Sequence, residues 1–337
     1  MINQSKIEPL GISIIIPAFN EEHYINRCLE SIVRLQIGRL DKEIIVVDNG
    51  SCDNTVEISK SYGAKVLVKK EGTIASLRNY GARFSNGQHL AFLDADCVVP
   101  KDWLLKAISY FQKEDRIVLG FRLSIPEHSN WVAKCWDLLF LKRDSTIEVE
   151  WIPTGNMIIP RDGFMSIGGF NEALESNEDY DFCFRIRKQG YRIISCSDAS
   201  VIHLRPPQSL FQIFKKELWH GKEVFKVFIN DIYQTKDIYI FKRKNFRVIS
   251  YAFCYLIFIL FQLVSLLLAV GSKIFLPLFV ALFFPVIISF FMALKYTRLT
   301  KKYNLILGLT ILFVIYGFSR ALSLLPYNKI GKWIPKQ

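Results

Sequence analysis

The chain has 337 residues, a formal charge of +12 and a hydrophobic fraction of 51%, which is high for a soluble protein. The charge is uneven, because residues 1–204 carry 24 Lys and Arg against 27 Asp and Glu, whereas residues 205–337 carry 19 against 4. Since the positive charges flank long apolar runs, the composition favours a membrane surface over nucleic acid as a partner. It predicts a nearly neutral globular part followed by a basic, apolar tail.

The first ninety residues alternate between strand and helix patterns. Short β-branched or apolar runs predict strands at 12–16, 43–48, 64–68 and 90–93, and apolar residues at helical spacing predict helices between them. This alternation, with about 25 residues per unit, predicts an α/β fold with a doubly wound, mostly parallel sheet. The first strand is too short for a signal peptide and ends in Pro17.

Carboxylates follow two of these strands. Asp48 ends the second strand, and Asp94 and Asp96 follow the apolar run 90–93. In an extended backbone residues i and i+2 project to the same side, so Asp94 and Asp96 are expected to stand together at the carboxyl edge of the sheet. Two adjacent carboxylates repel unless a cation lies between them, which favours a hard divalent ion bound with a diphosphate. Taken alone, the Asp-x-Asp pattern is more typical of a solvated turn after a strand than of a metal site.

The residues after 97 are less regular. They predict helices at 103–111 and 131–141 and strands at 117–121 and 191–195. A further helix begins at Glu178-Asp179, where the helix dipole favours negative charge, and Asp181 and Arg185 are spaced to form an exposed i, i+4 pair. From this helix alone, the two leading acids are equally compatible with capping and with catalysis.

The seven cysteines form no Cys-x-x-Cys pair and follow no regular spacing. This distribution predicts reduced thiols in a cytosolic compartment and argues against a disulfide framework or a structural zinc site.

Five motifs occur in one order over residues 11–204. They are Ile16-Pro17-Ala18-Phe19-Asn20-Glu21-Glu22; Val47-Asp48-Asn49-Gly50-Ser51 with Asp53 and Thr55; Arg78-Asn79; Leu93-Asp94-Ala95-Asp96 after Gly87; and Gly168-Gly169-Phe170 with Glu178-Asp179, Arg185 and Gly190. Together these motifs resemble those of family-2 glycosyltransferases with the GT-A type of nucleotide-sugar domain. The set is far more specific than any of its members.

The resemblance implies an inverting transfer from a nucleotide diphosphate sugar, with Mg²⁺ or Mn²⁺ as cofactor. It implies site residues of three kinds: for the nucleotide sugar, Pro17, Asn20, Glu22, Asp48, Arg78 and Asp94; for the metal, Asp94, Asp96 and His203; and for catalysis, Asp179 as general base with Glu178 beside it. One departure is Asn49, where a second Asp is common in the family. It leaves the identity of the nucleotide base open.

The tail predicts membrane attachment. Within residues 205–247, apolar residues at helical spacing over 210–228 alternate with lysines, a pattern typical of an interfacial helix and also of a helix packed on the globular domain. Residues 248–325 form a transmembrane region with spans at 248–270 and 274–294 and a third apolar run at 303–325 that is interrupted by Arg320.

Basic clusters precede the first span and follow the second, which predicts a cytoplasmic catalytic domain. A third crossing would place the basic tail 326–337 outside, against the same rule. The third run is therefore left open between a span and a re-entrant segment.

The sequence thus predicts an integral protein of the cell membrane that transfers a sugar to a lipid-linked or polyprenyl phosphate acceptor in cell-surface glycan biosynthesis. The alternatives are a processive polysaccharide synthase, which the few spans and the missing Gln-x-x-Arg-Trp signature disfavour, and a catalytically idle GT-A-like membrane scaffold, which the intact acidic sets disfavour. A nucleotidyltransferase or a Rossmann dehydrogenase would need a Gly-rich loop after the first strand, where this chain has residues 18–22.

Overall fold

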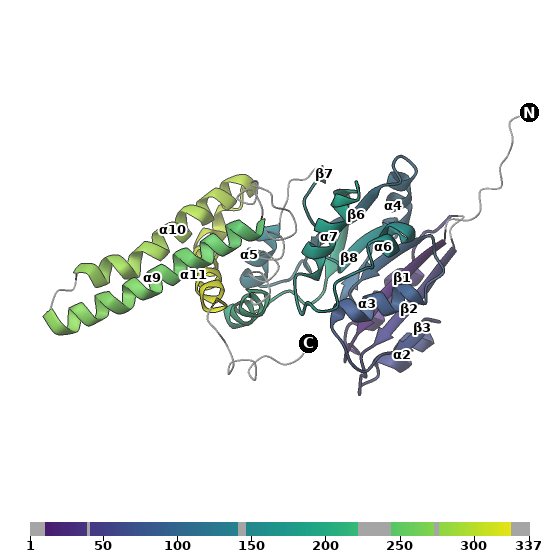
Figure 1. Ribbon diagram of the computed structural model, residues 1–337, viewed down its shortest axis with the longest axis horizontal. Coiled ribbons are helices and arrows are strands. Elements are labelled where there is room, and N and C mark those ends of the chain that lie inside the picture. Colours follow the sequence, from purple (N-terminus) through teal and green to yellow (C-terminus); the bar gives the residue numbers. More distant parts are fainter. Residues whose placement is uncertain (1–10, 39–40, 141–145, 222–243, 273–275, 325–337) are drawn as a thin grey trace, which may run out of the picture. The chain divides into compact units, whose positions relative to one another are not determined.

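The computed structural model describes residues 11–38, 41–140, 146–221, 244–272 and 276–324 (Figure 1). The chain divides into two compact units, one of residues 1–126 and 142–205 and one of residues 127–141 and 206–337. Parts of the predicted tail, namely residues 222–243, 273–275 and 325–337, lie outside the described residues.

We call the unit of residues 1–126 and 142–205 the catalytic unit because it holds the predicted catalytic residues Glu178 and Asp179. Its first half follows the predicted alternation. Its elements are β1 (Gly11–Ala18), α1 (Ile25–Val33), β2 (Asp41–Asp48), α2 (Thr55–Ser61), β3 (Lys65–Val68), α3 (Ile74–Arg83) and β4 (His89–Leu93). These strands pair in the order β3-β2-β1-β4, and every pairing is parallel. This half is the doubly wound sheet that the sequence predicts, with the carboxyl ends of β2 and β4 on one edge.

The second half makes the sheet mixed. Its elements are β5 (Cys97–Val98), α4 (Trp103–Phe111), β6 (Ile117–Ser124), β7 (Ile147–Glu148), β8 (Asn156–Pro160), α6 (Arg161–Ser166), α7 (Glu178–Lys188) and β9 (Arg192–His203). β8 runs antiparallel to both β4 and β6, and β5 and β7 run antiparallel to β9. The predicted parallel pairing thus holds throughout the N-terminal half and for β6 with β9. The sheet becomes mixed because β8 returns without the crossover helix that a parallel neighbour needs.

The core lies on both faces of this sheet. Successive residues of β1 alternate between two apolar clusters. Ile14 and Ile16 pack with α1 and α4, whereas Ile15 lies in the other cluster with residues of α3 and with Phe164 and Phe182. All five residues of β4 are buried, because it lies between β1 and β8. This double burial explains why the strand reads as a continuous apolar run that stops where the sheet ends.

β9 is longer than the sequence predicts. Polar residues after Ser195 interrupt the apolar pattern, yet β9 continues to His203 because its pairing with β6 resumes after an irregularity between Phe121 and Arg122. At its C-terminal end β9 also pairs with β5, where Cys97 lies opposite His203. This extension carries His203 to the segment that holds Asp96.

The second unit is helical. Its elements are α5 (Trp131–Phe140), a helix over residues 210–221, α9 (Lys244–Ser272), α10 (Leu276–Thr300), the short η2 (Tyr303–Leu305) and α11 (Ile306–Leu322). Three helices are long and apolar enough to cross a membrane, over Ser250–Leu268, Phe283–Thr300 and Tyr303–Leu322. α5, which sequence analysis places in the globular part, packs in this unit through an apolar cluster with α10 and α11.

Candidate active site

Arg78 joins two of the predicted motifs. Its Nη2 atom donates to Asp94 Oδ1 at 2.7 Å and its Nη1 atom to Glu178 Oε1 at 2.8 Å. The Arg78 side chain is 3% exposed, so a carboxylate on each side offsets the cost of burying its charge. The two ion pairs bring the end of β4 close to the start of α7, although Glu178 lies 100 residues after Arg78 in the sequence.

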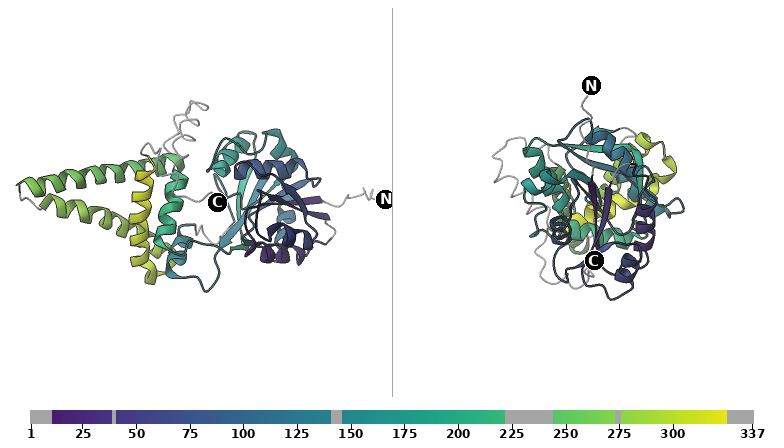
Figure 2. Two further views of the ribbon diagram at one scale, coloured as in Figure 1. Left: turned by 90° about the horizontal axis from the view of Figure 1, so that it is seen from below. Right: turned by 90° about the vertical axis from the view of Figure 1, so that its right-hand side faces the viewer.

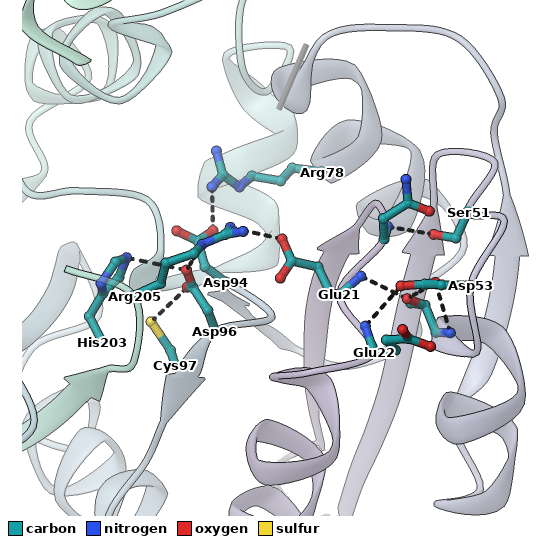
Figure 3. A network of polar contacts seen from close by, with 12 residues as sticks. Glu21, Glu22, Ser51, Asp53, Arg78, Asp94, Asp96, Cys97, His203 and Arg205 are labelled. Carbon is teal, nitrogen blue, oxygen red and sulfur yellow. Dashed lines mark hydrogen bonds and ion pairs between the residues drawn. The ribbon is translucent and has the colours of Figure 1, made fainter. Parts of the chain in front are cut away.

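The chain turns immediately after β4. Cys97 N donates to Asp94 O at 3.0 Å, so residues 94–97 form a tight turn and not a continuation of the strand. The extended geometry that sequence analysis assumed for the two aspartates is therefore wrong. Instead the two carboxylates have different partners, Arg78 for Asp94 and Arg205 with His203 for Asp96 (Figure 3). A Cβ at Gly155 would collide with the Asp94 carboxylate, which explains the glycine at that position.

Asp96 is the centre of a second polar cluster. Its carboxylate is 7% exposed and lies 3.5 Å from His203 Nε2 and 3.2 Å from Arg205 Nε. The other end of the guanidinium donates to Glu21 Oε1 at 2.9 Å. Arg205 also stacks over the Tyr24 ring at 5.3 Å. Figure 3 shows the Arg205 guanidinium between Asp96 and Glu21.

Sequence analysis missed Glu21 and Arg205 as site residues. Burial raises the pKa of Glu21, and the nearby Asp96 adds to the increase, while Arg205 opposes it. Among the described residues Glu21 Oε2 has no hydrogen-bond partner although it is buried. Glu21 lies within a quoted motif, but only the tertiary contact with Arg205 identifies it as part of this cluster.

The loop after β1 is joined to the loop after β2. Asn20, at φ +52°, accepts from Cys52 N at 3.0 Å, and Glu22 accepts from Asn54 N at 3.1 Å. Asp48 is buried and accepts from Gly50 N and Ser51 N at 2.9 and 3.0 Å. Three predicted nucleotide residues thus shape the rim of the sheet through loop contacts. Pro17 is buried in β1, opposite Val47 of β2.

Asn49, the departure from the family pattern, also contacts a loop. With its amide nitrogen turned toward the carbonyls that it faces, it donates to Lys69 O at 2.9 Å and Lys70 O at 3.3 Å. A carboxylate could not donate to these carbonyls. The departure therefore has a structural reason in the segment after β3.

Asp179 lies in the first turn of α7, is half-buried, and accepts from Tyr180 N at 2.7 Å. Its neighbour Glu178 is buried and held by Arg78. Of the two leading acids, Glu178 therefore positions the helix and Asp179 keeps the more accessible carboxylate.

The predicted pair of Asp181 and Arg185 is present, but it is not an exposed pair. Asp181 is 6% exposed and its carboxylate lies 2.7 Å from Arg185 Nη2. Arg185 also donates to the carbonyls of Ile167 and Gly169. The pair fastens α7 to the paired-glycine turn, in which Gly168 and Gly169 both have positive φ.

The predicted metal residues are only partly assembled. Asp96 and His203 are in contact, whereas Asp94 is held by Arg78. Within the described ranges, no three His, Cys, Asp or Glu side chains form a metal-binding cluster. The donor chemistry nevertheless fits, because carboxylate oxygens and an imidazole nitrogen are ligands that Mn²⁺ and Mg²⁺ accept, and the buried, unpaired Glu21 Oε2 lies in the same carboxylate cluster.

Comparison with known proteins gives a family match over part of this chain. Residues 13–168 match the model of Glycosyl transferase family 2. Glycosyltransferase AglE of Haloferax volcanii is 28% identical over 230 residues, which cover 65% of this chain and 75% of the relative. Chondroitin synthase of Pasteurella multocida is 27% identical over 186 residues, which cover 53% of this chain but only 19% of the relative.

Among solved structures, GalNAc-T7 with UDP, GalNAc and Mn²⁺ matches with a TM-score of 0.50 and 17% identity, over 64% of this chain and 51% of that chain. This likeness concerns the fold alone. It agrees with the GT-A type of α/β domain that the motifs predict.

Proposed function

We propose, from the premise that residues 13–168 belong to a family-2 glycosyltransferase domain, that this chain transfers a sugar from a nucleotide diphosphate donor to a lipid-linked acceptor at the membrane surface. The observation that carries the proposal is the Arg78 bridge, which gathers Asp94, Glu178 and the adjacent Asp179 at the carboxyl edge of β4. That edge is where open α/β sheets bind nucleotides.

Asp179 is the proposed general base. The acceptor hydroxyl loses its proton as its oxygen attacks the anomeric carbon, and a half-buried carboxylate at the rim can accept that proton. One base suffices for a single displacement that inverts the anomeric configuration. Glu178 and Arg78 act as positioning residues, because their ion pair fixes the turn from which Asp179 projects.

The nucleotide would lie over the joined loops after β1 and β2, with Pro17, Asn20, Glu22 and Asp48 at the rim. Asp96 and His203, with Asp94, would hold the divalent cation. When bound, the cation supplies positive charge that offsets the charge developing on the leaving diphosphate. Arg205 supplies positive charge at the same place, which makes it a further candidate contact for the diphosphate.

The lipid acceptor is proposed from the chain's own composition. Three candidate spans follow the catalytic unit, and after residue 237 the chain has basic but no acidic residues. A basic surface attracts anionic headgroups and a phosphate-bearing acceptor alike. By the positive-inside rule, the catalytic unit would be cytoplasmic.

The test is a donor screen with full-length protein in detergent. A panel of nucleotide sugars is supplied with Mn²⁺ or Mg²⁺ and extracted membrane lipid, and both released nucleoside diphosphate and sugar-labelled lipid are measured. We expect one donor to be consumed, in a reaction that chelator abolishes and Asp96→Asn slows by orders of magnitude. Full activity in excess chelator overturns the metal assignment, and water-soluble product alone overturns the lipid acceptor. A ladder of lengthening products would instead identify a processive synthase.

A further inference from the structure

α11 differs from the other two apolar helices in how much of it the protein covers. α11 itself has 17 residues, and together with η2 it forms a candidate span of 20 residues. Its candidate span, Tyr303–Leu322, is 44% buried within the protein, against 17% and 22% for the spans of α9 and α10. α11 therefore contacts protein over much of the surface that a spanning helix would present to lipid.

The N-terminal end of α11 packs on α5. A Cβ added at Gly308 would lie 2.8 Å from Cys135 Sγ and 2.9 Å from the Trp131 ring, so only glycine allows this approach. α5 is short, and the chain enters it after Pro126 and leaves it before Lys142, both of which belong to the catalytic unit. This end of α11 is therefore bound to a segment tethered at both its ends to the catalytic unit.

The C-terminal end of α11 packs on the 210–221 helix. Arg320 Nη2 lies 2.5 Å from Glu217 Oε2, and these side chains are 10% and 3% exposed. One turn further on, Gly221 directly faces the Ser323 side chain. Two buried opposite charges in contact fix this end firmly, because separating them would leave each charge unpaired.

Chain length restricts where Glu217 can lie. It follows Arg205, the last residue of the catalytic unit, by twelve positions, of which residues 210–217 are helical. Four extended residues and eight helical ones span at most about 26 Å, less than the hydrocarbon core. Glu217 cannot reach the far side of the bilayer, and neither can the Arg320 that it binds.

The middle of α11 crosses the α9–α10 hairpin. Phe313 O accepts from Tyr251 at 3.3 Å, and Gly317 lies against the Tyr255 ring. These two contacts with α9 fall within little more than one turn of α11. Figure 2 shows α11, in yellow, running across the green α9–α10 pair and not alongside it. Since both ends of α11 are tied to the catalytic side, the crossing orientation is that of a helix in the membrane plane.

We infer that only α9 and α10 cross the bilayer, and that α11 lies in the interface on the catalytic side together with α5 and the 210–221 helix. The exposed face of α11 contacts the lipid surface. Leu307 and Ile311 of α11 are 70% and 39% exposed, and on the α9–α10 hairpin Ile257 and Phe291 are 62% and 63% exposed. An apolar face at the depth of the headgroups is how interfacial helices bind.

The first experiment reads topology in sealed membrane vesicles with the full chain. Epitope tags are placed before Met1, after Gln337 and, in a separate variant, between α9 and α10 at Lys273, and each is tested for protection from protease. We expect the two terminal tags on one side and the Lys273 tag on the other. Terminal tags on opposite sides mean three crossings and overturn the inference. All tags on one side mean no crossing and overturn it as well.

A second experiment tests the contact at the C-terminal end of α11. Glu217→Cys with Arg320→Cys should be joined by a thiol cross-linker about as long as the ion pair that the two side chains form, seen as a mobility shift. The matched pair Glu217→Cys with Leu307→Cys, at the opposite end of α11, should not. The single variants control for the native cysteines. Failure of the first pair to cross-link, in protein that elutes like the wild type, overturns the arrangement, as does equal cross-linking of both pairs.

Discussion

At the scale of single residues, the site depends on which charges are paired. Arg78 and Arg205 each bind two carboxylates, and both arginines bring together groups from distant parts of the chain. These pairs distinguish acids held by an arginine, such as Glu178, from the more accessible Asp179, which we propose as the base. Three variants test this division.

Asp179→Asn should lower sugar transfer by about two to four orders of magnitude while leaving donor binding within about twofold, because the amide cannot accept the acceptor's proton. Glu178→Gln should instead weaken donor binding and lower stability together, since it removes one partner of the buried Arg78. Donor affinity by calorimetry and single-turnover transfer rates separate the two. The reverse pattern would make Glu178 the base.

Arg205→Gln should strengthen Mn²⁺ binding measured without donor, by roughly fivefold to tenfold, because Glu21 and Asp96 lose the positive charge that now lies between them. Electron paramagnetic resonance of free Mn²⁺ measures this directly. Arg192→Gln is the matched control, since Arg192 also binds two glutamates, Glu114 and Glu148, elsewhere in the sheet. Unchanged or weaker Mn²⁺ binding in Arg205→Gln would show that Arg205 does not compete with the cation.

Asp181→Asn should destabilise the catalytic unit by about 2 kcal/mol, more than an exposed pair would suggest, because the carboxylate is buried and its partner also holds the paired-glycine turn. The control is Glu30→Gln, which removes an exposed i, i+4 pair with Arg34 worth at most about 0.5 kcal/mol. Denaturant midpoints of the two variants give the comparison. Equal costs would mean that the contact with the turn adds nothing.

At the scale of elements, the first residue of β4 gives the catalytic unit a dependence on pH. His89 is buried against the Phe111 ring, and burial lowers its pKa to about 4, with Asp115 opposing this only in part. The folded state therefore disfavours the protonated form, which the unfolded chain takes up readily below its ordinary pKa near 6.5. The contribution to stability is complete above pH 6.5 and falls as the pH is lowered toward 4.

Over that interval the loss should be about 1.4 kcal/mol per pH unit, on the order of 3 kcal/mol in total. His89→Leu should flatten this slope, whereas His128→Leu, at an exposed position, should leave it unchanged. Unfolding in detergent can be followed by tryptophan fluorescence, to which Trp103, buried in the same unit, contributes. An identical slope in His89→Leu and wild type would assign the acid sensitivity to other groups.

At the scale of the whole molecule, the helical unit should make the chain an integral membrane protein. α9 and α10 carry exposed apolar side chains among their described residues, such as Leu267 and Phe291 at 73% and 63% exposure, which water does not solvate favourably. Alkaline carbonate should leave the chain in the membrane pellet, and detergent should release it. Release by carbonate alone would mean surface attachment without spans.

The sequence by itself determined the features that depend on local pattern. The alternation of strand and helix, the acids at the strand ends of β2 and β4, and the apolar lengths of α9 and α10 all follow from periodicity, because burial on two faces or in lipid leaves a continuous signal in the chain. The motifs that resemble the family are local patterns of the same kind, and the family match over residues 13–168 covers the first four of them.

Tertiary structure alone decided which charges meet and which faces are covered. Glu21, Arg205 and Asp96 are far apart in sequence, and the spacing of an i, i+4 pair such as Asp181 and Arg185 does not reveal whether another segment packs over it. Nor does hydropathy distinguish α11 from a spanning helix, since both are apolar. Its direction is fixed by the Arg320–Glu217 ion pair and by α5, that is, by partners that no local window of sequence contains.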